Sequence, residues 1–265
     1  MTFPTGCAVC GGELTSHTGV RICIACWSSL VPWDGPVCSR CGLPFASARA
    51  LDSAVKECGA CRLGGPAFDS ARSFGLYTGK LRQVILRLKF GGEERLGVRL
   101  GELLVPTWRL LPRIGGVAPC LMMPIPLHPA RQRERGFNQS DLLAEGLVRA
   151  LRKQGGSGEV RLCPEHLRRK RATPPQTGLS VAARRENLRG AFEVVRPEAV
   201  RARTVALIDD VMTTGATLSA CARVLKRAGA AQVMGVTLAR ATPQFPDLVR
   251  EERDNSVDGL GGDST

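Results

Sequence analysis

Eight of the eleven cysteines in the 265-residue sequence form four pairs of one kind, each with two residues between the cysteines. The pairs are Cys7/Cys10, Cys23/Cys26, Cys38/Cys41 and Cys58/Cys61. This spacing lets one tight turn aim two sulfur atoms at the same ion, and two such turns supply the four thiolates of a tetrahedral zinc site. The pattern therefore predicts two structural zinc sites.

Sequential pairing would build one site from the first two pairs and the other from the last two, and the spacing also allows a crossed arrangement. Iron–sulfur ligation is a weaker alternative, and disulfides are weaker still. Four thiolates close the coordination shell, so these sites are not expected to be catalytic. A module of roughly 60 residues without a long apolar stretch builds little core of its own, so metal is expected to hold it together.

Two adjacent carboxylates, Asp209 and Asp210, follow an aliphatic run at residues 204–208 and precede a loop rich in threonine. The residues after them that could hold an anion are Thr213, Thr214, Gly215, Ala216 and Thr217. The backbone N–H groups and the dipole at a helix start form an anion site. Carboxylates beside it fit a ligand with hydroxyls next to its phosphate, because a ribose diol donates hydrogen bonds to them. The alternative without a ligand is an Asp-Asp turn with a threonine as the helix N-cap.

The elements that must position these residues follow from the apolar patterns. Strands are predicted at residues 121–126, 204–208 and 232–239, and helices at residues 80–90, 94–111, 142–151 and 218–228. A polar, basic loop joins the first of these strands to the helix over 142–151. The order strand, helix, strand from residue 204 onward predicts an α/β fold with a parallel sheet. Ligands of such sheets bind beyond the carboxyl ends of the strands, where the acid pair and the threonine loop lie.

The cysteine pattern stops at Gly64-Gly65-Pro66, which divides the chain. We predict a cysteine-rich module over residues 1–64, an α/β domain over 65–242 and a disordered tail over 243–265. No apolar run approaches the ~20 residues of a membrane helix. The N-terminus also lacks the basic start and apolar core of a secretory signal. We therefore expect a cytoplasmic protein without membrane insertion.

The net charge of the chain is strongly positive, with 37 basic and 24 acidic residues and a formal charge of +13. This charge favours an anionic partner such as nucleic acid, phosphate or pyrophosphate, although solubility alone also accounts for it. Aromatic residues are only 5 % of the sequence, which argues against a broad platform for base stacking. The P-loop pattern G-x-x-x-x-G-K-[ST] is absent, which argues against ATP hydrolysis.

Several motifs together carry a resemblance to a known family. IDDVMTTGATL at 208–218 resembles the phosphoribosyl pyrophosphate (PRPP) motif of type I phosphoribosyltransferases. PIPLHPARQRERGFNQS at 124–140, RATPPQTGLSVAARRENLRGAF at 171–192 and TLAR at 237–240 extend the resemblance to the ComF family of GntX-like competence proteins. It covers about residues 5–242. The resemblance implies a type I phosphoribosyltransferase-like parallel sheet flanked by helices and preceded by a small cysteine-rich module with a double zinc ribbon.

The resemblance also implies roles for individual residues. Asp209 and Asp210 would hold the ribose hydroxyls and take part in the Mg²⁺ shell, and the residues from Thr213 to Thr217 would bind the 5′-phosphate. Arg135 and Gly136 fit the pyrophosphate position, with a solvated basic face as the other interpretation. Arg171, Gln176 and Arg184 fall where such enzymes carry a mobile lid and are weaker candidates. For Lys89, after the first long helix, we expect an exposed surface lysine rather than a ligand of the pocket.

The ComF resemblance implies a PRPP-binding protein that acts in DNA uptake and natural transformation. Single-stranded DNA and other competence or recombination proteins are the partners it suggests. Phosphoribosyl transfer to an acceptor would make the protein an enzyme, but no catalytic base stands out, because His17, His128 and His166 are dispersed. The alternative is a non-enzymatic zinc-ribbon protein that binds nucleic acid or a partner and uses the PRPP fold as scaffold or sensor.

Overall fold

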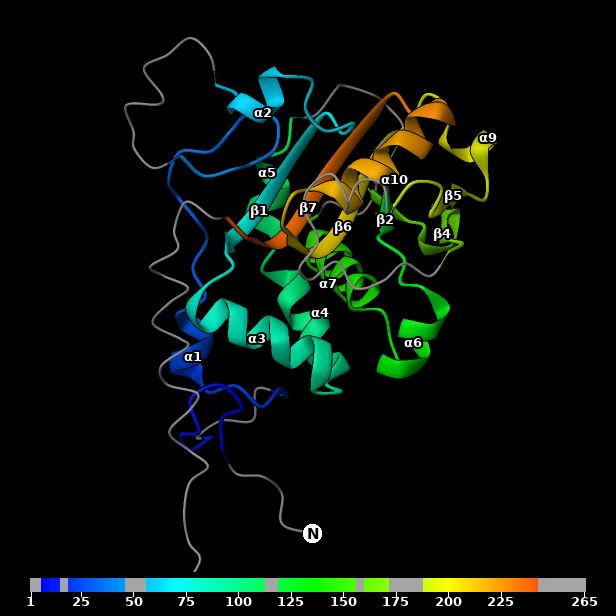
Figure 1. Cartoon of the computed structure of the whole chain (residues 1–265). Helices are drawn as coiled ribbons and strands as arrows, with labels where there is room; N and C mark the ends of the chain where they lie inside the picture. Colours follow the sequence, from blue (N-terminus) through cyan, green and yellow to red (C-terminus); the bar gives the residue numbers. More distant parts are fainter. Residues whose placement is uncertain are drawn as a thin grey trace, which may run out of the picture.

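The computed structural model describes residues 6–14, 19–45, 56–112, 119–155, 160–171 and 188–242. A five-stranded sheet with the order β1-β7-β6-β2-β3 lies at its centre, and every strand pair in it is parallel. Its strands are β1 (Ser70–Leu76), β2 (Cys120–Pro124), β3 (Val160–Leu162), β6 (Thr204–Met212) and β7 (Gln232–Arg240). Two short strands, β4 (Leu167–Arg169) and β5 (Phe192–Val194), form a separate antiparallel pair. The parallel sheet confirms the predicted α/β fold (Figure 1).

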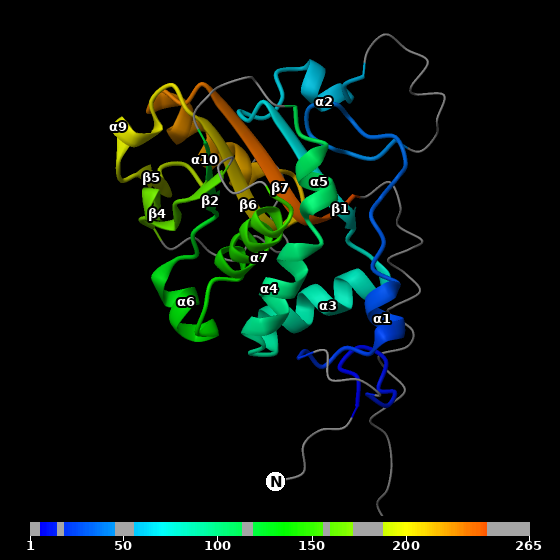
Figure 2. The same cartoon turned by 180° about the vertical axis from the view of Figure 1, so that it is seen from behind.

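Helices cover both faces of the sheet. One face packs against α3 (Gly79–Phe90), α4 (Glu94–Glu102), α5 (Val105–Arg109) and α7 (Gln139–Lys153), and the other against α10 (Ala216–Arg227). Successive side chains of β6 point to opposite faces of the sheet, so both faces are apolar and need cover. Ala206 and Ile208 belong to the core on the first face, and Val205 and Leu207 belong to the core on the second. Figures 1 and 2 show the resulting three layers from opposite sides.

The remaining helical segments are short. They are α1 (Ile24–Ser28), α2 (Gly59–Arg62), α6 (Pro129–Arg135), η2 (Pro164–His166) and α9 (Pro197–Val200). The prediction of one helix over 94–111 was wrong, since α4 ends at Glu102 and α5 begins at Val105. Pro106 explains the break, because proline lacks the N–H that a continuous helix would need at that position.

Two glycines bring α7 close to α4 and so fix the position of its N-terminus. A Cβ atom at Gly146 would lie 2.0 Å from the carbonyl oxygen of Val98, and one at Gly101 would lie 2.2 Å from that of Leu143. Any side chain at either position would therefore push the helices apart. The N-terminal end of α7 carries Ser140, which reaches the end of β6.

The two halves of the cysteine-rich module dock on different layers. Cys7 and Cys26 share the core that contains α3 and α4, and the Arg99 guanidinium lies 5.4 Å from the centre of the Trp27 ring. The cysteines of the second half share the core on the α10 face. Figure 1 accordingly shows α1 beside α3, and α2 at the other end of β1. The predicted tail over 243–265 lies outside the described residues.

In the described part of the chain, every helix is too short or too polar to span a lipid bilayer.

Candidate functional site

The topology of the sheet marks one point at which a ligand is expected to bind. β2 and β6 are neighbours, and their connections lead away to opposite sides of the sheet. β2 leads through α7 to β3, whereas β6 leads through α10 to β7. Ligands of open parallel sheets bind at the carboxyl ends of the strands where the strand order reverses in this way. Asp209 and Asp210 lie near the carboxyl end of β6 and hence at this point.

The loop after β6 has the geometry of an anion cradle. Gly215 has a φ of 74°, a left-handed conformation that favours glycine, and it is the N-cap of α10. The helix begins at Ala216, earlier than predicted, so the last two residues of the threonine loop form its first turn. The backbone N–H of Ala216 donates to Thr214 Oγ1 at 3.3 Å, and both Thr213 and Thr214 are exposed. The loop therefore offers accessible hydroxyls beside the N-terminus of a 12-residue helix.

Asp210 is buried and pairs with a cation from another helix. It is 4 % exposed, and its Oδ1 lies 3.2 Å from Nζ of Lys89 at the end of α3. Its Oδ2 is also buried and has no hydrogen-bond partner among the described residues. Burial lowers the pKa of Lys89, but the negative charges of Asp210 and Asp209 outweigh burial and raise the pKa above its usual value, so Lys89 is a cation.

The expectation that Lys89 is an exposed surface lysine was therefore wrong. Its side chain is only 19 % exposed. A signal for this was present in the sequence, because Lys89 lies four residues after Ile85 on the buried stripe of α3.

Asp209 is half-buried, and α7 holds it in place. Its Oδ1 accepts hydrogen bonds from Ser140 Oγ at 3.2 Å and from the backbone N–H of Asp210 at 3.0 Å. Burial, followed by the charge of Asp210, raises the pKa of Asp209 to about 7, while Lys89 and the hydrogen bonds oppose this. Two crowded carboxylates of this kind favour a cation or a hydroxyl donor over a bare anion.

The segment before α7 ties the ends of β2 and β6 together. Asn138 is the N-cap of α7, and its Oδ1 accepts the N–H of Ser140 at 3.2 Å. Its Nδ2 donates to the carbonyl oxygen of Ile125, which follows β2, at 3.1 Å. Asn138, Gln139 and Ser140 are all buried. Among these polar residues, sequence reasoning missed the contact of Ser140 with Asp209, because no periodic pattern marks a single buried hydroxyl.

Arg135 and Gly136 lie at the end of α6, a short helix within the stretch that was predicted to be a loop. The φ of Gly136 is 83°, which ends the helix. Arg135 Nη1 donates to Oε1 of Gln139 at 3.0 Å, and its guanidinium lies 5.4 Å from the centre of the Phe90 ring. Arg135 thus contacts the chain neighbours of Ser140 and Lys89, the two residues that bind Asp209 and Asp210.

Of the remaining lid candidates, Gln176 and Arg184 lie outside the described residues. Arg171 is exposed and donates to the carbonyl oxygen of Arg189 at 3.2 Å. His128 is the N-cap of α6, where its Nδ1 accepts the N–H of Ala130 at 3.2 Å.

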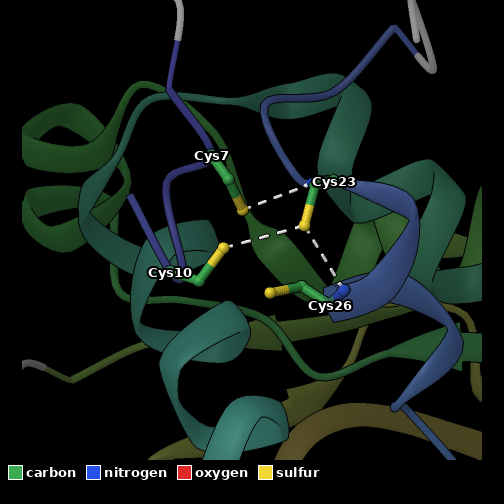
Figure 3. A group of neighbouring side chains, drawn as sticks. All are labelled: Cys7, Cys10, Cys23 and Cys26. Atoms are coloured by element: carbon green, nitrogen blue, oxygen red, sulfur yellow. Dashed lines mark hydrogen bonds between the residues drawn. The ribbon is translucent and has the colours of Figure 1, made fainter. Parts of the chain in front are cut away.

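The first cysteine cluster is shown in Figure 3, where the side chains of Cys7, Cys10, Cys23 and Cys26 gather around one point. Their sulfur atoms all lie within 4.8 Å of one another, and Cys10 Sγ is 3.7 Å from Cys23 Sγ. Four thiolates about 2.3 Å from a tetrahedral zinc ion are separated by about 3.8 Å, so this spacing fits zinc. Burial raises the pKa of Cys7, but backbone N–H groups, among them that of Cys23 at 3.3 Å, outweigh it and lower the pKa to about 6.

The second cluster contains Cys38, Cys41, Cys58 and Cys61, all of them buried. Cys41 Sγ is 3.6 Å from Cys58 Sγ, and the backbone N–H of Cys58 donates to Cys38 Sγ at 3.3 Å. All eight cysteines are free, and a disulfide would require sulfur atoms about 2.05 Å apart. The structure therefore groups the pairs sequentially, and both clusters fit the zinc sites of a double ribbon.

Comparison with known proteins agrees with this arrangement. The double zinc ribbon domain family matches residues 1–62. The DNA utilization protein YhgH of Escherichia coli O157:H7 is 34 % identical over 242 residues, which cover 91 % of this chain and 99 % of that protein. Competence protein F of Haemophilus influenzae is 32 % identical over 242 residues, which cover 90 % of this chain and 98 % of that protein. Among solved structures, the glutamine PRPP amidotransferase of B. subtilis aligns with 53 % of this chain and 25 % of its own chain, at 20 % identity and with a TM-score of 0.32.

Proposed function

Because the chain belongs to the ComF family, together with competence protein F and the DNA utilization protein YhgH, we propose that it is a PRPP-binding protein that acts in DNA uptake. The observation that carries the PRPP assignment is the acid pair at the switch point of the sheet. The threonine loop follows the pair in the chain, and Arg135 bonds to Gln139, the chain neighbour of Ser140, whose hydroxyl bonds to Asp209. A hydroxyl-bearing ligand with a phosphate at each end suits this set of groups.

In this proposal each predicted residue keeps its role. The carboxylates of Asp209 and Asp210 accept from the ribose hydroxyls, and Arg135 and Gly136 bind the pyrophosphate. The 5′-phosphate lies against the threonine loop, formed by Thr213, Thr214, Gly215, Ala216 and Thr217. The buried, unpartnered Oδ2 of Asp210 supports the assignment, because a buried acceptor of this kind requires a donor or a cation. Carboxylate oxygens also suit Mg²⁺, which would offset the charge of the pyrophosphate.

The proposed role in DNA uptake comes from the names of the relatives and from the charge of +13. Basic side chains that are exposed or half-buried line α6 and β4, including Arg131, Arg133 and Arg168. They support single-stranded DNA as a partner, alongside other competence or recombination proteins, with affinity that falls steeply as salt rises. We place the chain in the cytoplasm, where reducing conditions keep the cysteines available for zinc. The proposed units remain residues 1–64, 65–242 and 243–265.

The test is a thermal-shift titration of the zinc-loaded chain with PRPP and Mg²⁺. Ligand at about 100 times its Kd adds about 2.7 kcal/mol to the free energy of unfolding. For a domain of this size that corresponds to roughly 5–10 °C. The Asp209→Asn/Asp210→Asn variant should lose the shift, and Glu198→Gln, at an exposed carboxylate of α9, should keep it. An intact chain that shows no shift, or an Asn variant that shifts as much as the intact chain, would refute the PRPP assignment.

A further inference from the structure

Arg240 lies at the end of β7, in the TLAR motif to which the proposed function gives no role. It is 6 % exposed although it carries a full charge. Its Nη1 donates to the carbonyl oxygen of Met212 at 3.2 Å and to that of Thr213. These two carbonyls belong to the last residue of β6 and the first residue of the threonine loop. Arg240 therefore fixes the backbone from which the candidate phosphate loop starts.

The second cysteine cluster lies on the other side of the same arginine. A cavity of about 90 Å³ is lined by Arg240, by Cys41, Cys58 and Cys61 of the cluster, and by Thr214, Gly215 and Ala216 of the loop. The cluster and the threonine loop therefore face each other across one small space that contains a buried cation.

Hydrogen bonds connect this half of the ribbon to β1. The N–H of Ala71 on β1 donates to the carbonyl oxygen of Arg40 at 2.7 Å, and Arg72 Nη1 donates to that of Ser39 at 2.8 Å. The N–H of Ala67, at the start of the α/β domain, donates to Ser219 Oγ on α10 at 3.0 Å. The first cluster, in contrast, packs into the core on the opposite face of the sheet. A structural change at the second cluster can therefore reach the threonine loop through few contacts.

We infer that Arg240 is a positioning residue that couples metal occupancy of the second cysteine cluster to the order of the threonine loop, and thereby to its affinity for phosphate. Four thiolates and one Zn²⁺ carry a net charge of about −2, which the guanidinium partly neutralises. Without metal the ribbon is expected to open. Arg240 then loses the wall of the cavity and becomes accessible to water. Water competes for the guanidinium, so the arginine and the two carbonyls that it holds are expected to rearrange.

The coupling is tested on the full, zinc-loaded chain with two independent readouts. Hydrogen exchange of the amides of residues 213–217 reports loop order without any ligand. Calorimetric titration with PRPP and Mg²⁺ reports affinity, and this part of the inference rests on the proposed function. The variants are Arg240→Met, Arg240→Lys and Cys58→Ser. Arg227→Met, at an exposed position of α10, serves as a charge control, Cys23→Ser as the control in the first cluster, and zinc content is measured for every variant.

The expected pattern separates the two clusters. Arg240→Met should keep two zinc ions per chain, but it should speed hydrogen exchange of the loop and weaken PRPP binding at least tenfold. Arg240→Lys should recover part of the slow exchange and part of the PRPP affinity. Cys58→Ser should lose one zinc ion and show the same loop effects. Cys23→Ser should lose one zinc ion while loop exchange stays near that of the intact chain, and Arg227→Met should change neither readout.

Two results would overturn the coupling. One is unchanged loop exchange in Arg240→Met and Cys58→Ser, and the other is equal loosening of the loop by Cys23→Ser. If the intact chain does not bind PRPP, the proposed function fails, while the exchange data still decide the coupling. Circular dichroism of each variant identifies any global unfolding. If Arg240→Met is unfolded, the coupling is judged from Arg240→Lys, which keeps the charge.

Discussion

Replacing Lys89 with methionine should remove the cation that compensates Asp210. The two charges are 3.2 Å apart, and the side chains are 19 % and 6 % exposed. Coulomb's law at an effective dielectric of about 20 gives an attraction of about 5 kcal/mol at that distance. Loss of one partner leaves a buried carboxylate uncompensated, so Lys89→Met should lower the free energy of unfolding by about 3–5 kcal/mol. Methionine keeps the apolar stem, so little of this loss comes from packing.

A double-mutant cycle in urea unfolding, followed by the fluorescence of the three tryptophans, isolates the interaction. Asp210→Asn alone should also destabilise, because it leaves Lys89 without its counter-charge. The double variant Lys89→Met/Asp210→Asn should be more stable than the two single losses added together predict. A matched control is Lys226→Met, whose ion pair with Asp69 has side chains that are 31 % and 41 % exposed. That pair should contribute less than about 1 kcal/mol.

The ion pair between Lys89 and Asp210 is refuted as a buried interaction if the losses of the two single variants simply add, or if Lys89→Met destabilises no more than Lys226→Met. Additive losses in the free energy of unfolding would mean that the two charges do not interact. The ammonium would then be no part of the acid pair.

Three further predictions concern the same site. Because the pKa of Asp209 is raised to about 7, the folded state holds a proton that the unfolded chain has released between pH of about 4 and about 7. The free energy of unfolding should therefore fall as pH rises through this window, and Asp209→Asn should flatten the slope in urea melts at a series of pH values. Arg135→Ala should weaken PRPP binding about tenfold in calorimetry and leave ribose 5-phosphate binding nearly unchanged, and equal losses for both ligands would contradict a pyrophosphate role. Removing Mg²⁺ should weaken PRPP binding at least tenfold at constant ionic strength, and an unchanged Kd would place the metal outside the site.

The parts of the molecule that follow from local patterns were predictable from sequence. The β6-α10-β7 unit follows from an aliphatic run, a helical period and a second aliphatic run, and the acid pair lies where these patterns place it. The four C-x-x-C pairs predicted two clusters, but spacing alone allowed two arrangements. The structure selects the sequential one, because each half of the module docks on a different layer.

Long-range contacts were not predictable in the same way. The helical pattern of α3 shows which face is buried, but not that Lys89 meets a carboxylate 121 positions later in the chain. The contacts of Ser140 and Arg240 could not be predicted from the sequence for a related reason. Their partners are a carboxylate and two backbone carbonyls at the end of β6, and only the order of strands in the sheet brings these groups together.

The charges of the candidate site narrow the class of phosphate ligand that it can accept. Asp209 and Asp210 repel a bare phosphate, and Lys89 offsets only one of them. The groups suited to phosphates are separate from the carboxylates, with the threonine loop after them in the chain and Arg135 before α7. A nucleoside triphosphate carries its phosphates in one run, so it would leave one of these two places empty. A sugar diol with a phosphate at one end and a pyrophosphate at the other would occupy all three places and bring hydroxyls to the carboxylates, and for this reason we propose PRPP rather than a nucleotide as the ligand.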